Sequence, residues 1–252
     1  MIEVEVSEQE RASRIAAFLL KRVNRAIRDF AMIRDGDRIA VAVSGGKDSL
    51  GLLHLLSQRR RSAPEKYELI GIHIRGDGRG PTEPYEPLET WLRQLDIPVV
   101  CEDWDLPPDE PLPMNCFRCS WNRRRQLFLT AHRLGCNVVA LGHHADDIIE
   151  TFLLNLFQNG RLDTMAPHSV YFDGVLRLIR PLIYAPEKEM RRLAAAMGFP
   201  PPPPSCPQSD STAREDAHQL LQMAQARFPQ TYANLLRLAL SPYPRGEPVR
   251  QR

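Results

Sequence analysis

RIAVAVSGGKDSLGLLHLL, residues 38–56, is the stretch that decides the fold of this chain. Its first part is a short apolar run typical of a buried strand, and its last part predicts a helix through Leu56. Between them lies the turn SGGKDS, residues 44–49, in which two glycines permit a tight bend and the helix start exposes backbone N–H groups. Two serine hydroxyls and Lys47 add donors, so the turn suits a pyrophosphate. It is not a Walker motif, because Asp48 follows the lysine and Val41 replaces the first glycine; the alternative is an ordinary tight turn.

Strands alternate with helices around this turn. The strands are expected at Arg38–Ser44, Tyr67–Arg75, Ile97–Trp104, Asn137–Gly142 and Leu176–Ile183, and helices at Leu88–Leu95, Ser120–Leu134, Asp146–Gln158 and Pro186–Met197. This alternation predicts an α/β fold with a mostly parallel sheet that helices cover on both faces. Such sheets bind ligands at the carboxyl ends of their strands.

The two ends of the chain differ from this pattern. An amphipathic helix is expected within residues 1–30, opened by a capping box of Ser7 and Glu10. The nucleotide-binding domain is expected over 31–200. Residues 201–252 continue a run of five prolines that begins at Pro200, then carry Cys206 and a helical tail opened by Thr212 and Glu215, and residues 242–252 are expected to be frayed.

Composition excludes several classes of protein. The chain has 252 residues, 43% hydrophobic and 25% charged, which are ordinary globular values. No apolar run is long enough to cross a membrane and the N-terminus is acidic, so we expect a cytoplasmic protein without membrane association. A net charge of +2 argues against a histone-like binder of nucleic acids but allows local basic patches.

Two sets of residues point to metal chemistry. LGHHADDIIE, residues 141–150, places Asp146 and Asp147 at a helix start, where carboxylates either cap the helix or hold the Mg²⁺ that accompanies ATP; the paired histidines also allow a metal phosphohydrolase. Five cysteines, an odd number, favour metal or redox chemistry over disulfides. Three of them, a CxxC pair and one distant thiol, suit an iron–sulfur cluster with one open iron, or a redox trio. They are Cys116, Cys119 and Cys206, whereas Cys101 and Cys136 are expected to be packing residues.

SGGKDS after a first strand resembles the PP-loop ATP pyrophosphatases, which adenylate a carbonyl oxygen and release pyrophosphate. Joined to the CxxC pair, GHHADDIIETFLLNLF, IRPLI at Ile179–Ile183 and a proline-flanked Cys206, it resembles the tRNA 2-thiocytidine synthetases from about Asp37 to Gln208. The resemblance implies an adenine-nucleotide α-hydrolase-like fold and an ATP-dependent sulfurtransferase that replaces O2 of an anticodon-loop cytidine by sulfur. It further implies Mg²⁺, a three-cysteine [4Fe–4S] cluster whose fourth iron can carry the sulfur, tRNA, a sulfur donor (a cysteine desulfurase or sulfide) and a homodimer.

The resemblance also assigns site residues. Catalysis is expected from Asp147, Arg123, Asp146 and Lys47, with Asp147 also on Mg²⁺. ATP binding is expected from Ser44, Gly45, Gly46, Lys47, Asp48, Ser49, His73, Ile74 and Gly142.

Three alternatives stay open. Uridine 2-thiolases of the same superfamily usually carry terminal zinc fingers, for which this sequence has no cysteines. A ligase of the lysidine-synthetase type would need no cysteine trio, and a cluster-binding redox protein would need no SGGKDS. The chain departs from close relatives in one respect, because Pro207 and Gln208 follow Cys206 where a further cysteine is common.

Overall fold

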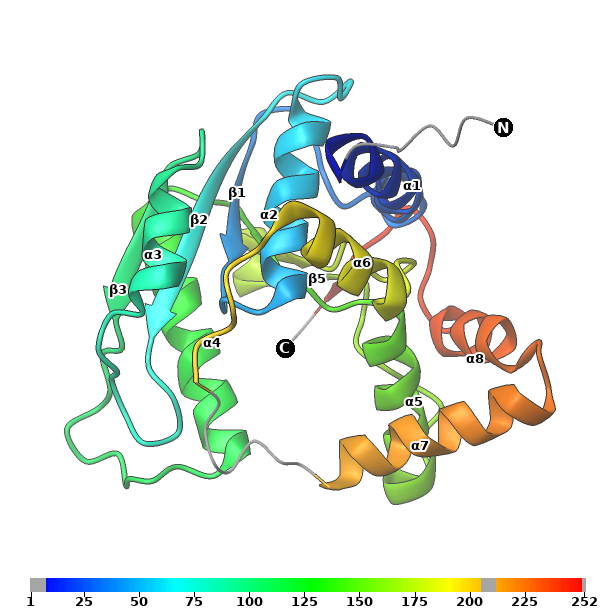
Figure 1. Ribbon diagram of the computed structural model, residues 1–252. Coiled ribbons are helices and arrows are strands. Elements are labelled where there is room, and N and C mark those ends of the chain that lie inside the picture. The colour runs from blue at the N-terminus through cyan, green and yellow to red at the C-terminus, as the bar shows by residue number, and fades with distance from the viewer. Residues whose placement is uncertain (1–7, 205–211, 251–252) are drawn as a thin grey trace.

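The computed structural model describes residues 8–204 and 212–250, which form a seven-stranded sheet with helices on both faces (Figure 1). The strands are β1 (Asp37–Ala42), β2 (Tyr67–Arg75), β3 (Val99–Asp103), β4 (Val138–Ala140), β5 (His168–Tyr171), β6 (Leu176–Ile179) and β7 (Val249–Arg250). The helices are α1 (Glu8–Asp29), α2 (Lys47–Arg60), α3 (Glu86–Arg93), α4 (Cys116–Arg133), α5 (Ala145–Asn159), α6 (Glu187–Met197), α7 (Thr212–Arg227) and α8 (Thr231–Leu240), and a short 3-10 turn, η1, covers Phe172–Gly174.

The strand order is β3-β2-β1-β4-β6-β5-β7, and the first five strands in this order run parallel. From β1 the chain winds to one side through β2 and β3, and then returns to add β4 and β6 on the other side. The connections that follow β1 and β4 therefore separate at a topological switch point, where open sheets of this kind bind ligands. The predicted fold class is confirmed.

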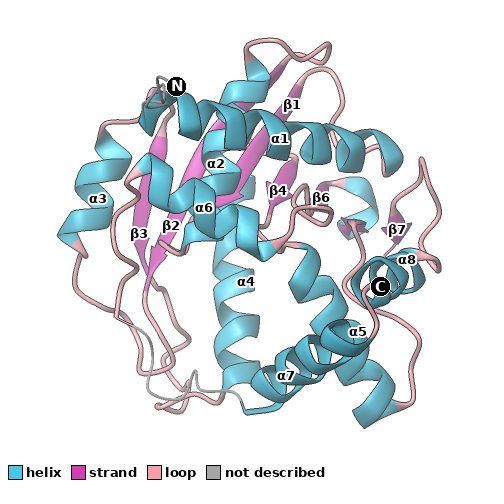
Figure 2. Cartoon of the chain, turned by 45° about the vertical axis from the view of Figure 1, so that its right-hand side comes forward, coloured by secondary structure: helices cyan, strands magenta, loops and turns pink. Residues whose placement is uncertain are grey.

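Two apolar cores flank the sheet. One lies under α1, α2, α3, α5 and α6 and includes Ile39, Leu53 and Phe152, each fully buried. The other lies under α4 and includes Val139, Leu127 and Leu178. Figure 2 shows α4 apart from the helices of the first face. The near-continuous apolar strands reflect this double coverage, because both faces of the central strands are buried.

The structure corrects the sequence expectations at the edge of the sheet that β6, β5 and β7 form. The fifth expected strand, Leu176–Ile183, stops at Ile179, just before Arg180-Pro181, because proline has no N–H to donate to a strand ladder. A strand was missed at β5, which pairs antiparallel with β6. The expected fraying of residues 242–252 is wrong at Val249–Arg250, which pairs with β5 as β7.

Two expectations fall on residues that the structure does not describe. They are the capping box at Ser7 and the placement of Cys206, which lie outside 8–204 and 212–250. No helix within those ranges is both long and apolar enough to cross a membrane.

Candidate active site

The turn after β1 and the turn after β4 meet at the switch point. Gly142, in the second turn, lies directly against the backbone of the first turn of α2. A Cβ built on Gly142 would lie 3.0 Å from the Asp48 carbonyl carbon and 3.0 Å from the Ser49 nitrogen. Only glycine allows so close an approach of two backbones. The two motifs that lie about a hundred residues apart in the sequence therefore form one site.

The SGGKDS turn is closed by its own side chains. Ser49 Oγ donates to the Gly46 carbonyl at 2.8 Å and accepts from the Ser44 N–H at 3.2 Å, while the Gly46 N–H donates to Ser44 Oγ at 3.3 Å. Among residues 8–204 and 212–250, no side chain caps the N-terminus of α2 at Gly46. Its first N–H groups are therefore left to a ligand, and an anion is the ligand that a helix N-terminus favours.

Lys47 is held between two carboxylates. Its Nζ lies 3.0 Å from Asp48 Oδ2 and 3.0 Å from Glu187 Oε1 at the start of α6. Burial alone would lower the pKa of Lys47, but these two carboxylates raise it, so the side chain is a cation. Burial alone would raise the pKa of Glu187, but hydrogen bonds from Lys47 and Arg191 lower it to about 2. Sequence reasoning missed Glu187, because nothing local links it to a lysine 140 residues earlier.

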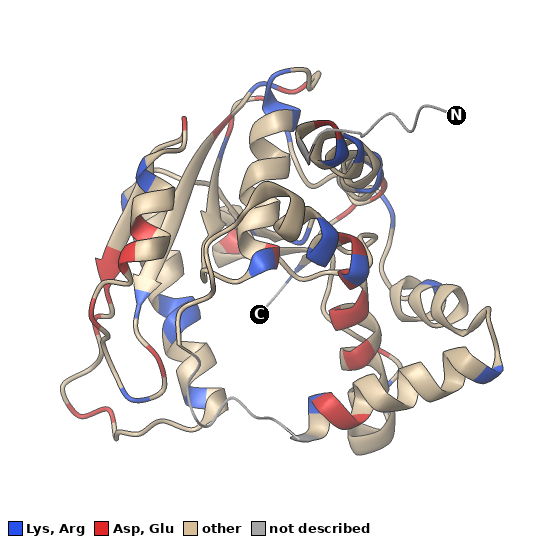
Figure 3. Ribbon diagram, viewed as in Figure 1, with Lys and Arg blue, Asp and Glu red and all other residues tan. Residues whose placement is uncertain are grey.

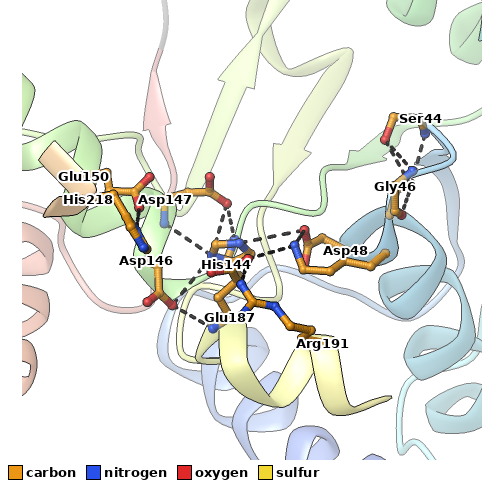
Figure 4. A network of polar contacts seen from close by, with 12 residues as sticks. Ser44, Gly46, Asp48, His144, Asp146, Asp147, Glu150, Glu187, Arg191 and His218 are labelled. Atoms are coloured by element: carbon orange, nitrogen blue, oxygen red, sulfur yellow. Dashed lines mark hydrogen bonds and ion pairs between the residues drawn. The ribbon is translucent and has the colours of Figure 1, made fainter. Parts of the chain in front are cut away.

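The two aspartates at the start of α5 have different partners (Figure 4). Asp147 Oδ2 accepts from the His144 N–H at 2.9 Å and the Asp147 N–H donates to His144 Nδ1 at 3.3 Å, so the two residues cap the helix reciprocally. Asp146 Oδ2 accepts from the Glu187 N–H at 2.7 Å and from the Tyr232 hydroxyl at 2.9 Å. Asp146 thereby ties α5 to α6 and α8, whereas Asp147 Oδ1 stays near the site, 3.9 Å from Arg214.

One carboxylate of the candidate active site, that of Asp48, has an oxygen available to a cation. Within the part of the chain that is described, no group of three His, Cys, Asp or Glu side chains is arranged to hold a metal. Asp48 Oδ1, however, is buried and has no hydrogen-bond partner among the described residues, and burial raises the pKa of this carboxyl. One orphaned carboxylate oxygen fits Mg²⁺, which binds one or two carboxylates and takes its other ligands from phosphates and water.

A neutral histidine and a buried arginine lie beside the aspartates. Arg180, just after β6, is 6% exposed, and its Nε donates to His143 Nδ1 at 3.2 Å. Burial, and then the charge of Arg180, lowers the pKa of His143 to about 3. Arg124 and Arg214 add positive potential at the same imidazole. Arg180 forms no ion pair with a carboxylate of the described residues, so this corner of the site is electropositive.

Arg123 on α4 and two residues near the end of β2, His73 and Ile74, are held by contacts with neighbouring elements. Arg123 Nη2 donates to the Gly76 carbonyl at 2.5 Å, and its guanidinium lies 5.4 Å from the Trp104 ring centre, leaving Nε buried without a hydrogen-bond partner. His73 is buried and its Nδ1 lies 2.8 Å from the Val43 carbonyl, which holds the end of β1 against β2. Ile74 packs in the core under α4.

The four described cysteines differ in burial: Cys136 is buried, Cys101 and Cys119 are half-buried and Cys116 is exposed. Cys116 and Cys119 occupy the first turn of α4, one exposed and the other half-buried, whereas Cys206 lies outside the described residues. Burial raises the pKa of Cys101 and of Cys136, as it does for packing residues. The proline segment that precedes Cys206 passes over the phosphate turn, since a Cβ on Gly45 would lie 2.5 Å from Pro203 Cδ.

Comparisons with known proteins identify the family of the chain. A profile of the PP-loop domain matches residues 19–199. Among curated relatives, a tRNA-cytidine(32) 2-sulfurtransferase from Aeromonas hydrophila is 37% identical over 233 residues, covering 90% of this chain and 76% of the relative. A protein of the same name from Geobacter sulfurreducens is 43% identical over 190 residues, covering 73% of each.

A solved structure has the same fold. It is the U34-tRNA thiolase from Methanococcus maripaludis with its [4Fe-4S] cluster, and it superimposes with a TM-score of 0.73, covering 90% of this chain and 78% of that one. The sequence identity is 19%, so this likeness concerns the fold.

Proposed function

The chain belongs to the PP-loop family of the tRNA-cytidine(32) 2-sulfurtransferases, and on that premise we propose that it is an ATP-dependent enzyme that replaces O2 of a tRNA cytidine by sulfur. The observation that carries the proposal is the contact of Gly142 with the Asp48–Ser49 backbone, which joins the phosphate turn to the acidic start of α5. An ATP whose phosphates lie on the turn would have its α-phosphate between the two motifs.

The first step is attack of cytidine O2 on the α-phosphate, which gives an adenylated base and pyrophosphate. The uncapped N–H groups of α2 would hold the departing pyrophosphate, and Lys47, a cation throughout the neutral range, would balance its charge. Asp48 and Asp147 would hold Mg²⁺, which would neutralise negative charge on the phosphates. Electrostatics and positioning do most of the work in such phosphoryl chemistry.

The second step replaces the adenylated oxygen at C2 by sulfur and releases AMP. Cys116, Cys119 and Cys206 would hold a [4Fe–4S] cluster that would present sulfur at the oxidation level of sulfide, taken directly from sulfide or from a cysteine desulfurase together with a two-electron thiol reductant. The first two thiols fit this role, because they share one helix turn and α4 offers its N-terminal dipole to thiolates. Arg123, one turn further along α4, would offset charge that develops on the base.

The test is an anaerobic reaction of the purified protein with ATP, sulfide and unmodified tRNA. We expect AMP and pyrophosphate together with 2-thiocytidine, detected by mass spectrometry of the digested RNA. Formation of ADP and phosphate would contradict the PP-loop reaction, and 2-thiouridine would reassign the substrate.

Cysteine variants test the sulfur step separately. Cys116→Ala, Cys119→Ala and Cys206→Ala are each expected to lose iron and thiolation while AMP formation persists. The matched controls Cys101→Ala and Cys136→Ala lie in packed surroundings and should keep both properties. Iron retained in all three ligand variants would refute the three-cysteine cluster.

A further inference from the structure

One face of α4 exposes two aromatic side chains next to two arginines. Phe117 and Trp121, four residues apart and therefore on one side of the helix, are 75% and 49% exposed. Arg124 and Arg125 follow one turn later and are also exposed. We call these four residues the α4 face.

The charged side chains of α4 are basic. The helix carries Arg118, Arg123, Arg124, Arg125 and Arg133 and has no acidic residue. Three of the five have partners. Arg118 pairs with Glu110, Arg133 pairs with Glu102 and Arg123 turns inward to Gly76.

Arg124 and Arg125 have no ion pair or hydrogen bond among the described residues, and they follow Trp121 by one helical turn. The guanidinium of Arg118 lies over the Trp121 ring, 5.4 Å from its centre, and the side chain of Trp121 is still 49% exposed. Figure 3 shows the basic segments of α4 and, across the molecule, acidic segments of α5 and α7.

The α4 face connects two parts of the candidate active site. The first turn of α4 holds Cys116 and Cys119. Further along the helix, Arg124 adds positive potential at His143 and Arg180. Past Arg125, the buried Phe128 packs edge-on against Phe172, which is 62% exposed and adds an apolar side chain to the neighbouring surface.

We propose that the α4 face binds unpaired nucleotides of the RNA substrate, with a base stacked on Trp121 and a phosphate contacted by Arg125. This proposal rests on the proposed function and assigns it an RNA-binding surface. Exposed aromatic rings interleaved with arginines are the elements that bind single-stranded RNA, since every base has a face to stack and every linkage a charge. A second copy of the chain is disfavoured as the occupant, because it would bring unpaired arginines of like charge together.

The experiment measures the affinity of the full-length protein for a fluorescently labelled anticodon stem-loop by anisotropy. Trp121→Ala is expected to weaken binding roughly 5- to 100-fold, the range found for loss of one stacked base. Trp121→Phe should restore most of the affinity. Arg125→Gln should lower the slope of log affinity against log salt by about 0.7, the value for one phosphate contact on a single strand.

Two controls separate this surface from general effects. Phe228→Ala removes an aromatic ring that is 64% exposed but lies between α7 and α8, and it should leave RNA affinity unchanged. Binding of ATP should be unchanged in every variant, because no member of the phosphate turn is altered.

The outcomes are distinguishable. Unchanged RNA affinity in Trp121→Ala overturns the α4 face while the thiolation of wild-type protein still supports the proposed function. A change of oligomeric state in Trp121→Ala, with RNA affinity unchanged, would instead assign the face to a second copy. Failure of the wild-type protein to bind or thiolate RNA would overturn the proposed function itself.

Discussion

Gly45 shows how tightly the phosphate turn is enclosed. Its φ is +86°, a conformation that glycine adopts at no steric cost, and a Cβ there would meet both Pro203 and Leu88 at under 3 Å. The turn requires a positive φ at residue 45, which favours glycine. Pro203 and Leu88, which are distant in the sequence, leave no room for a Cβ there. A single residue thus links the phosphate turn to the proline segment.

Gly45→Ala is therefore expected to reduce both stability and ATP affinity. The matched control is Gly36→Ala, since Gly36 has a φ of +80° but nothing within 4 Å of its Cβ position. Gly36→Ala should lower the free energy of unfolding by only about 1–2 kcal/mol, which is the cost of holding an alanine in the left-handed conformation, and it should not change ATP affinity. Urea unfolding and ATP titration distinguish the two. Equal ATP affinity in both variants would show that Pro203 moves away without consequence.

Asp147 and Asp146 are expected to respond differently to mutation. Asp147→Asn keeps a carbonyl oxygen for the His144 N–H, so the cap survives and at most about 0.3–1 kcal/mol of helix-dipole energy is lost. We expect its thiolation rate to fall about 10²–10³-fold, because a charge next to the phosphates is gone.

Asp146→Ala should instead cost about 1–3 kcal/mol of stability, because the Glu187 N–H and the Tyr232 hydroxyl lose their acceptor. Thermal unfolding and a thiolation assay of both variants check this division. A fully active Asp147→Asn protein would show that Asp147 caps α5 and does not take part in catalysis.

At the scale of elements, α7 contacts α5 through titratable side chains. His218 Nδ1 lies 2.8 Å from Glu150 Oε1, and Arg214 lies near Asp147. The hydrogen bond with Glu150 raises the pKa of His218, and burial raises the pKa of Glu150. The helix that follows the third cysteine therefore packs on α5 through a contact that depends on pH.

The sign of this dependence follows from the raised pKa of His218. The stabilisation is complete below the ordinary histidine pKa of about 6.5 and is lost as pH rises through the raised value. We expect a double-mutant cycle of His218→Ala and Glu150→Gln to give a coupling of about 0.3–1 kcal/mol at pH 6 that vanishes near pH 9. The measurement is urea unfolding at both pH values. A coupling that grows with pH would mean that the charged pair is not what joins the helices.

At the scale of the whole molecule, the two ends of the sheet have different tasks. The carboxyl ends of the strands carry the candidate active site. The opposite end contains Arg177, on β6, in a buried ion pair with Asp37 at the start of β1, and Asn137 also donates to Asp37. This polar cluster crosses β4 and joins the two halves of the sheet, away from the phosphate turn.

Arg177→Ala should consequently destabilise the protein without changing its ATP affinity. Removing one member of a buried pair costs about 3–5 kcal/mol, since the other charge is left unpaired. The control is Arg38→Ala, whose partner Glu68 is 71% exposed and whose ion pair is worth about 0–1 kcal/mol. Denaturant unfolding and ATP titration under native conditions test both. A large loss of ATP affinity in folded Arg177→Ala would contradict the separation of the two ends.

The sequence by itself determined the features that are encoded locally. Hydrophobic periodicity predicted the parallel strands and their helices, because a strand buried on both faces must be apolar along its length. SGGKDS and the paired aspartates predicted a site at the carboxyl ends of the strands that precede them, because mostly parallel sheets bind ligands at those ends. Only the tertiary structure decided which distant side chains meet there. Glu187 on Lys47, Arg180 on His143 and Pro203 on Gly45 join segments that no local pattern relates, as does the pairing of β7 with β5. The physical reason is that periodicity reports burial of one segment, whereas a contact between segments depends on how the folded sheet orders them.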